Sequence, residues 1–292
     1  VQTTMACQAG KDVYVEKPLT ITLNEGRKMV NTAHDTNRIV AVGLNRRGSV
    51  VYQHLAKEVQ AGKIGRVSVA LAGRVSNMFP VGIGKMQPSE PPKDFDWDMW
   101  LGPRAERPYQ YNIAPYKFRW WSDYSSQMGN WGVHYMDVLR WLMGETAPVA
   151  ISAVGSRNII DDDSDIPDTM EVLFEFKSGS VIKFSLNEAC SGGVAPWGEV
   201  ALRGTNGNLY AQENGYKIEA SSPGQFQSWE PRVESQGQDA GEIMGEPNAR
   251  PDSAARLIRN FLDCVKTREQ PWCPLEDGHR STSFAHLANI SL

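Results

Sequence analysis

The stretch GNWGVHYMDVLRWLMG, Gly129–Gly144, predicts the most buried helix of this 292-residue chain. From Val133 to Met143 apolar residues occupy almost every position, so the pattern leaves no broad polar face. A helix of this kind is covered on most sides by other elements. We therefore expect residues 133–143 to form a helix inside a hydrophobic core.

Two ionisable residues, His134 and Asp137, interrupt this apolar helix. They are three residues apart and share one face, and Asn130 precedes His134 by four residues near the helix start. Buried ionisable groups need partners, so one interpretation is a core histidine hydrogen-bonded to Asp137. The other is a general base, because the reference pKa of histidine, about 6.5, lies near neutrality. No third ligand accompanies the pair, so no metal site is predicted.

A second informative stretch is VYVEKPLT, Val13–Thr20. Its strand-like beginning stops at Pro18, which has no N–H group to donate and therefore ends a sheet ladder. Pro18 also holds Lys17 in an extended conformation. Open α/β sheets bind ligands beyond the carboxyl ends of their strands, which is where this lysine falls. A solvated lysine at the start of a loop is the alternative interpretation.

The order of predicted elements changes along the chain. Helix and strand alternate at first, with a helix ending at Gly10, a strand at 13–15, a helix over 23–34 with Asn24 as its N-cap, and a strand at 38–44. This order is typical of a parallel, doubly wound sheet. A helix over 48–62 and a strand over 66–75 follow. Between 149 and 210, successive strands without helical crossovers predict antiparallel pairing.

Three later segments complete the pattern. The acidic patch DDDSD, 161–165, has Ile166 where a calcium loop needs glycine, and we expect a solvated loop there. Residues 221–247 are rich in polar residues, Gly and Pro without any period, which is typical of a long surface loop. An amphipathic helix is predicted over 252–266, and a further helix from Asp277 onward.

Composition excludes several classes of protein. The formal net charge of −4 and the lack of a basic run argue against nucleic-acid binding, which depends on neutralising phosphates. No apolar run approaches the roughly 18 residues that a membrane span needs. The four cysteines show neither a CxxC pair nor a zinc-like spacing with histidine.

The segment Phe95–Tyr124 is unusually aromatic. It contains ten aromatic residues, in a chain that has nine each of Trp, Tyr and Phe, interleaved with aspartate and arginine. Aromatic faces next to charged groups suit a sugar or polyol, whose C–H face stacks while its hydroxyls need donors and acceptors. Packing inside a loop is expected to account for most of these rings, and we assign substrate contact to Trp120, Trp121 and Tyr124.

Several of these motifs occur together in the order typical of the Gfo/Idh/MocA family of oxidoreductases. The chain resembles that family in EKP after a strand, RIVAVGLNRR, GKIG, DWDMWLGP, GNWGVHYMDVLRWLMG and the closing PWCPLEDGHRSTSFAHLANISL. The resemblance implies an α/β (α+β) fold: the C-terminal part of a Rossmann-like parallel sheet at residues 1–46, followed over 47–292 by an α/β domain. The second domain is expected to contain a large, mostly antiparallel open sheet, through which copies of the chain form a homo-oligomer.

The resemblance also implies residue roles. The lysine of EKP, Lys17, is expected near both nicotinamide and substrate, and His134 is expected to act on the substrate hydroxyl as catalytic base. Oxidation of an alcohol needs a base at the oxygen and a cation for the developing alkoxide, which these two residues could supply. NAD or NADP is the expected cofactor, held by Glu16, Lys17, Pro18 and Asn45, and the substrate is expected to contact Asn130, Asp137 and Arg46 in addition to the aromatic residues.

Two departures from the family pattern affect these expectations. The family often carries aspartate four residues before the histidine, where this chain has Asn130, which can neither take up a proton nor supply negative charge. No GxGxxG dinucleotide fingerprint follows a first strand. We expect the sequence to be a fragment without the pyrophosphate-binding part of its Rossmann domain and without the extreme C-terminus, and these residues alone to bind NAD(P) weakly or not at all.

Three functions stay open at this point. The leading hypothesis is an NAD(P)-dependent oxidoreductase that acts on a sugar or cyclitol hydroxyl. The second is an NAD-dependent glycoside hydrolase that works by transient oxidation of the sugar, and the third is a non-catalytic sugar-binding relative. Net accumulation of reduced cofactor would separate the first two. The sequence does not discriminate between a cytoplasmic and an exported protein.

Overall fold

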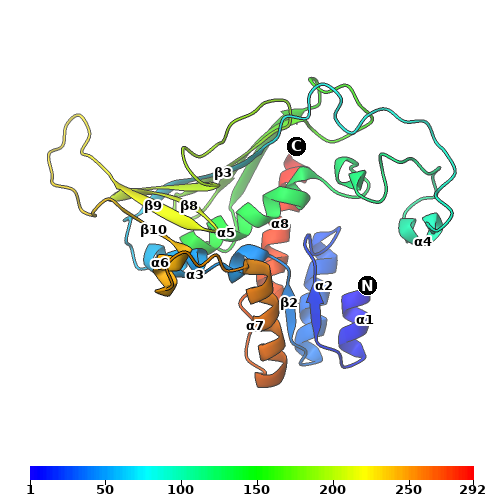
Figure 1. Ribbon diagram of the computed structural model, residues 1–292, viewed down its shortest axis with the longest axis horizontal. Helices are drawn as coiled ribbons and strands as arrows, with labels where there is room; N and C mark the ends of the chain where they lie inside the picture. Colours follow the sequence, from blue (N-terminus) through cyan, green and yellow to red (C-terminus); the bar gives the residue numbers. More distant parts are fainter.

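The N-terminal part of the computed structural model, which describes all residues 1–292, is a small parallel α/β unit (Figure 1). Strand β1 (Val13–Val15) pairs in parallel with β2 (Val40–Val42), and helix α2 (Leu23–Asp35) connects them. Helix α1 (Gln2–Gln8) packs against α2. The predicted βαβ arrangement is confirmed.

The start of α2 differs from the prediction. Its N-cap is Thr22, not Asn24: the Thr22 hydroxyl accepts a hydrogen bond from the backbone N–H of Glu25, and the Glu25 carboxylate accepts one from the Thr22 backbone. This reciprocal capping box satisfies two backbone donors, whereas a lone Asn cap would satisfy one. The T-x-x-E spacing in the sequence is the signal that identifies it.

The remaining chain is built around an eight-stranded sheet with the order β10-β9-β8-β7-β3-β6-β5-β4. Only β3 and β6 run parallel; every other neighbouring pair is antiparallel, as the sequence predicts for a mostly antiparallel sheet. The strands are β3 (Val67–Val75), β4 (Ala150–Ser156), β5 (Thr169–Glu175), β6 (Val181–Asn187), β7 (Val200–Gly204), β8 (Gly207–Gln212), β9 (Gly215–Ala220) and β10 (Gln236–Asp239). β10 and the short helix α6 (Ala240–Met244) lie inside the predicted surface loop.

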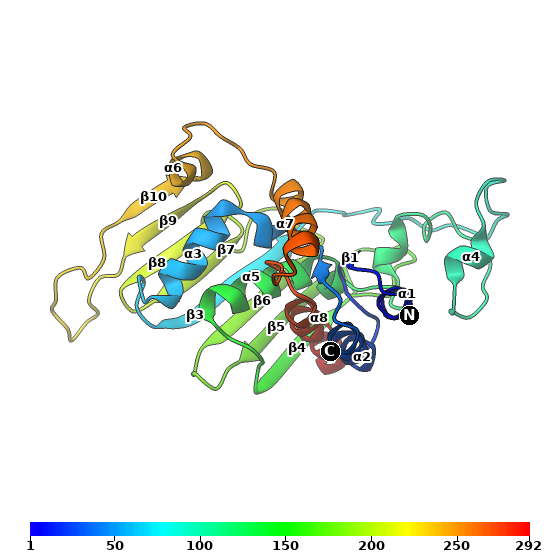
Figure 2. The ribbon, with the colours of Figure 1, turned by 90° about the horizontal axis from the view of Figure 1, so that it is seen from below.

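Helices cover one face of this sheet and leave the other open (Figures 1 and 2). Helix α3 (Val50–Gln60) and helix α5 (Val133–Met143) pack beneath it, and β5 alternates between buried and exposed side chains, with Phe174 fully buried and Leu173 41% exposed. Alternation of this kind marks a sheet with one solvated face. A homo-oligomer through this open face stays a prediction. No helix in the structure is long and apolar enough to cross a membrane.

The C-terminal segment of the chain packs against the N-terminal unit, while the predicted boundary at residue 46 stays a prediction. Helix α7 (Ser253–Thr267) and the first turns of α8 (Leu275–Ser291) return to the small sheet, where Leu257, Cys273 and Leu275 share a hydrophobic cluster with Val42 of β2. A backbone hydrogen bond of 3.0 Å joins the Val42 N–H to the Cys273 carbonyl. The C-terminal segment therefore completes the core of the N-terminal unit, because two short strands cannot cover their own apolar faces.

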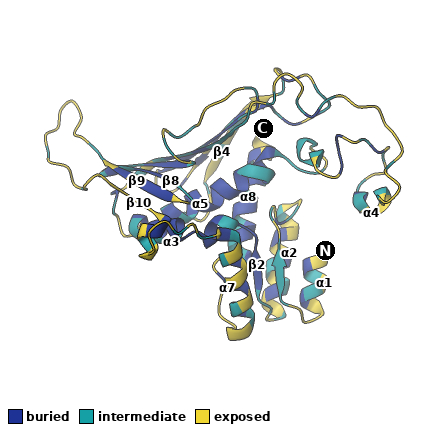
Figure 3. Cartoon of the chain, in the orientation of Figure 1, coloured by how far each residue is buried: buried dark blue, intermediate teal, exposed yellow.

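The aromatic segment leaves the body as an extended arm that carries helix α4 (Trp97–Leu101) and the 3₁₀ turn η2 (Lys117–Trp120) (Figure 3). Side chains of the acidic patch 161–165 bond to residues of this arm, so the prediction of a solvated loop there is only partly correct. The Asp162 side chain is fully buried and pairs with Arg157, and the Asp163 carboxylate accepts from Asn112 at 2.7 Å. The sequence alone does not reveal the contact with the arm, because Asn112 lies 51 residues before Asp163.

Shortening one side chain of α7 tests whether the C-terminal segment stabilises the N-terminal unit. Leu257→Ala removes a fully buried side chain from the shared cluster, so we expect it to lower the free energy of unfolding by about 2–5 kcal/mol. The neighbouring Ile258 is 44% exposed, and Ile258→Ala is the matched control with a smaller expected loss. Urea denaturation measures both, and equal losses would contradict this packing.

Candidate active site

The carboxyl ends of β1 and β2 meet at one edge of the small sheet. The Gly43 N–H donates to the Val15 carbonyl at 2.8 Å, so the two chain segments leave the sheet side by side. A Cβ on Gly43 would lie 2.9 Å from a carboxylate oxygen of Glu16, which shows how closely they approach. Asn45 begins the 3₁₀ turn η1 (Asn45–Gly48) just beyond this point. The structure thus brings the EKP segment and Asn45 together, as a ligand site at a strand edge requires.

Lys17 points from this edge toward the start of α5. Its Nζ atom donates a 2.6 Å hydrogen bond to the Asn130 carbonyl, across 113 residues of sequence. Burial lowers the pKa of Lys17 to about 8, and the nearby positive charges of Arg119 and Arg46 act in the same direction while Glu16 opposes them. Lys17 therefore keeps its charge at neutral pH but lies close to losing it.

His134 lies on the first turn of α5 and is 8% exposed. Neither ring nitrogen makes a hydrogen bond within the protein, and Nδ1 is buried without any partner. Burial lowers the pKa of His134 well below its usual value, and the charges of Arg46 and Lys17 lower it further. The ring is neutral at physiological pH and keeps a lone pair available for a proton.

Asp137 does not pair with His134, which corrects one interpretation of the sequence. Its carboxylate is fully buried and accepts both branches of the Arg47 guanidinium, at 2.7 and 2.9 Å, and the Ser281 hydroxyl at 2.7 Å. Because the Asp137 side chain is fully buried and held by these bonds, none of it faces solvent, and its predicted contact with substrate gains no support from this geometry. Its role is to hold α5 to η1 and α8.

Arg46 is buried beneath the site. Two of its nitrogens bond the Glu199 carboxylate at 2.8 and 2.5 Å, and the Tyr52 hydroxyl donates to the same carboxylate at 2.6 Å. The guanidinium also lies 5.0 Å from the centre of the Tyr135 ring. Two of its five N–H donors are therefore occupied, and its charge acts on the site by lowering the pKa values of Lys17 and His134.

A buried carboxyl group, Glu188, is the main site feature that the sequence reasoning missed. It lies just after β6 and accepts hydrogen bonds from Trp120 Nε1 at 2.9 Å and Gln127 Nε2 at 2.8 Å. Gln127 in turn accepts from the Asn130 side chain at 3.2 Å. Burial raises the pKa of Glu188 to about 7. Its position directly after a buried strand is the same signal that identified Lys17.

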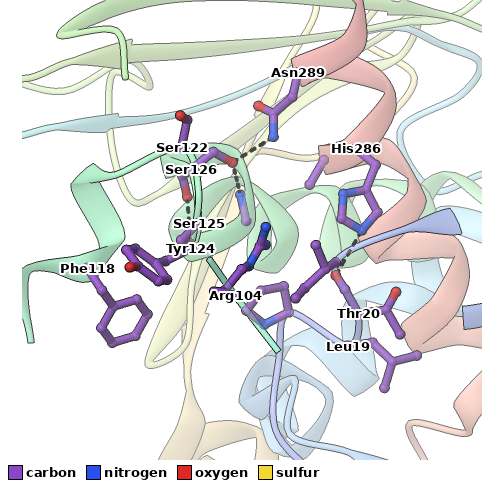
Figure 4. A pocket seen from close by; sticks show the side chains of 14 residues that line it. Leu19, Thr20, Arg104, Phe118, Ser122, Tyr124, Ser125, Ser126, His286 and Asn289 are labelled. Atoms are coloured by element: carbon purple, nitrogen blue, oxygen red, sulfur yellow. Dashed lines mark hydrogen bonds between the residues drawn. The ribbon is translucent and has the colours of Figure 1, made fainter. Parts of the chain in front are cut away.

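The three predicted aromatic residues divide between two roles. Trp120 bonds Glu188, and Trp121 donates to the Asn112 carbonyl at 2.8 Å while Arg107 stacks on its ring, so both hold the arm in shape. Tyr124 instead lines a cavity of about 340 Å³. Figure 4 shows this cavity between the arm, the 18–21 loop and α8. Pro18 and Gly129 line this cavity. They are the chain neighbours of Lys17 and Asn130, which form the hydrogen bond described above.

These residues fit one end of a dinucleotide and no metal ion. Lys17 has a single protein acceptor and His134 an unpartnered nitrogen, so both retain unused hydrogen-bonding capacity toward a bound molecule. Glu16, Pro18 and Asn45 form the adjoining strand edge. No group of three or more His, Cys, Asp or Glu side chains is arranged to hold a metal.

Comparison with known proteins identifies the class of this fold and site. Residues 49–219 match the family model described as the oxidoreductase family C-terminal alpha/beta domain, and residues 2–44 match the NAD-binding Rossmann fold of the same family. The chain belongs to the Gfo/Idh/MocA oxidoreductase family. Among curated proteins it is similar to scyllo-inositol 2-dehydrogenase (NAD(+)) of Bacillus subtilis (strain 168), with 36% identity over 61 residues. That alignment spans 21% of this chain and 18% of the relative.

Solved structures confirm the fold class. An oxidoreductase domain protein from Kribbella flavida superposes with a TM-score of 0.72 at 16% identity, covering 99% of this chain and 74% of the other. Levoglucosan dehydrogenase in complex with NADH and levoglucosan gives a TM-score of 0.70 at 17% identity, covering 99% of this chain and 73% of the other. At these identities the likeness concerns the fold alone.

Removal of the Asp137 carboxylate tests its structural role. Asp137→Ala leaves Arg47 buried without its bidentate partner, and we expect a loss of about 3–5 kcal/mol in the free energy of unfolding. Asp263→Ala breaks a pair between two well-exposed side chains and is the control, with little expected change. Urea denaturation measures both; an Asp137 variant as stable as the control would refute the assignment.

Proposed function

We propose that the protein is an NAD(P)-dependent oxidoreductase that oxidises a hydroxyl group of a sugar or cyclitol. The observation that best supports this proposal concerns Lys17 and His134, which lie far apart in the sequence. The half-buried lysine and the buried histidine without a hydrogen-bond partner come together at the strand edge of a Rossmann-type unit. The lysine acts on the histidine electrostatically, because the Lys17 charge lowers the pKa of His134. These are the two groups that alcohol oxidation requires.

His134 is the proposed base. A hydroxyl proton must leave as the carbon is oxidised, and a neutral imidazole with a free lone pair can accept it. The burial that keeps this ring neutral also keeps it in the accepting form throughout the physiological pH range.

Lys17 is the proposed cation beside the substrate oxygen. Its ammonium carries three donors, and the protein takes one of them through the Asn130 carbonyl. The remaining donors stabilise negative charge as it develops on the oxygen, and partial burial strengthens that interaction. The carbonyl bond fixes where the ammonium stands before substrate arrives.

The nicotinamide end of NAD(P) would lie against Glu16, Pro18 and Asn45 at the strand edge, which belongs to the matched NAD-binding Rossmann fold. When bound, it supplies the acceptor for the hydride that leaves the substrate carbon. The names of the relatives, an inositol dehydrogenase and a levoglucosan dehydrogenase, support a cyclitol or sugar as substrate. The cavity beside Pro18, walled by Tyr124 and Phe118, offers rings against which a C–H face can stack.

Substitution of the two groups tests this mechanism. We expect Lys17→Met and His134→Ala each to lower kcat by about 10²-fold or more in the complete protein, since each removes charge stabilisation or proton transfer from the reacting oxygen. Lys28→Met and His34→Ala are matched controls, because both side chains are exposed and far from the strand edge. Formation of reduced cofactor is the readout. Turnover that survives both active-site changes would overturn the assignment, and turnover of a glycoside without net reduced cofactor would favour the hydrolase.

The pH dependence of the reaction tests Lys17 separately. The lysine is charged below its pKa of about 8 and loses its charge as pH rises through that value. We therefore expect kcat/KM to fall above pH 8, because the neutral amine no longer stabilises the alkoxide. The residual activity of Lys17→Met should not fall in this range. The same alkaline decline in that variant would assign the titration to another group.

A further inference from the structure

The cavity beside Pro18 has an unusual balance of charge. Among its lining residues, Arg104 is the only permanently charged one, and its guanidinium makes no hydrogen bond or ion pair in the structure. No aspartate or glutamate lines the cavity. Two carboxylates bond lining residues from outside the lining: Asp165 accepts the backbone N–H and the hydroxyl of Ser122, and Glu25 accepts the Ile21 N–H at 3.2 Å. Neither carboxylate pairs with Arg104, so its guanidinium is a full positive charge in the cavity lining with all of its donors unused.

Arg104 lines this cavity together with part of the aromatic cluster of the arm. Trp100 of α4 stacks on Trp97 with ring centres 5.0 Å apart and packs against Phe118 at 6.0 Å and Tyr124 at 5.1 Å. Phe118 and Tyr124 themselves form part of the cavity wall. Arg104 follows α4 after the turn at Gly102 and lines the same cavity. Figure 4 shows Arg104 extending between Tyr124 and His286.

The remaining lining groups suit hydroxyls. The Ser126 hydroxyl oxygen accepts from Gly129 N–H at 3.0 Å and from Asn289 Nδ2 at 2.8 Å, which leaves its own proton free to donate. His286 Nε2 lies 2.9 Å from the Thr20 carbonyl, which can only accept, so this nitrogen carries the proton. Burial lowers the pKa of His286, so the ring is neutral and its Nδ1 can accept from a ligand. Donors and acceptors thus stand on both sides of the cavity.

We propose that this cavity binds a sugar or polyol that carries a carboxylate or phosphate group, and that Arg104 recognises the anionic group. A guanidinium binds either group through two parallel hydrogen bonds, and Tyr124 and Phe118 provide the apolar wall. The volume of about 340 Å³ lies at the lower end of small-molecule sites, as a single sugar unit requires. The inference rests on the proposed function in that it names the substrate class of the same site, which begins beside Lys17.

Binding measurements on the purified protein, without cofactor, test the inference independently of turnover. Isothermal titration with glucuronate, glucose 6-phosphate and glucose compares a carboxylate, a phosphate and a neutral ligand of similar shape. We expect at least one anionic ligand to bind about tenfold or more tightly than glucose, as one charge-assisted hydrogen-bond pair provides. A preference for glucuronate over glucose 6-phosphate identifies the carboxylate, and the reverse identifies the phosphate.

Substitutions of Arg104 test whether this residue causes the preference for the anionic ligand. Arg104→Gln should abolish the advantage of the anionic ligand, and Arg104→Lys should keep part of it, because the charge remains but the two-pronged geometry is lost. Lys93→Gln, an exposed position on the same arm, changes the net charge equally and should leave binding unchanged. Thermal melting checks that each variant is folded.

Two results would overturn the inference: equal binding of all three ligands by the unmodified protein, or an anionic preference that persists in Arg104→Gln. Lys17→Met distinguishes this failure from that of the proposed function. If that variant loses turnover but keeps the anionic preference, both proposals stand. If neutral sugars alone are bound and oxidised, the proposed function stands and the anionic site is refuted.

Discussion

The buried ion pair between Arg47 and Asp137 is the interaction on which the arrangement of this molecule depends. It joins the turn that leaves the small parallel sheet to the most apolar helix of the chain. Ser281 donates to the same carboxylate, and Arg140 bonds Asp277 at 2.7 Å, so α8 joins the network. An ion pair out of water contributes little net stability but is costly to break, and its geometry allows few alternative packings.

This network determines where the candidate catalytic groups stand. Asp137 lies one turn after His134 on α5, and Arg47 follows Arg46 on the turn, so fixing one pair places the other beside it. Arg46 then acts on Lys17 and His134 through its charge while Glu199 holds it in place. The structural and electrostatic roles are thus divided between two consecutive arginines, one facing the core network and one beneath the site.

The sequence predicted the elements of the fold more accurately than their partners. The helix over 133–143 and the strand predicted over 66–75 have the predicted bounds to within a residue or two, because hydrophobic period and turn residues act locally. The return of α7 and α8 to the small sheet was missed, since amphipathicity shows that a helix packs but not against what. Asp137 was misassigned for the same reason: its spacing from His134 is local, whereas its true partner lies 90 residues away.

For this protein the sequence alone determined the class of fold, the presence of a lysine at a strand end and a histidine on a buried helix, and the family resemblance that connects them. Those features depend on neighbours along the chain. Only the tertiary structure decided which charges pair, that Glu188 is buried beside Trp120, and that Arg104 is left without a partner in a cavity. Pairing between residues far apart in sequence depends on how closely the folded elements approach, which no local pattern encodes.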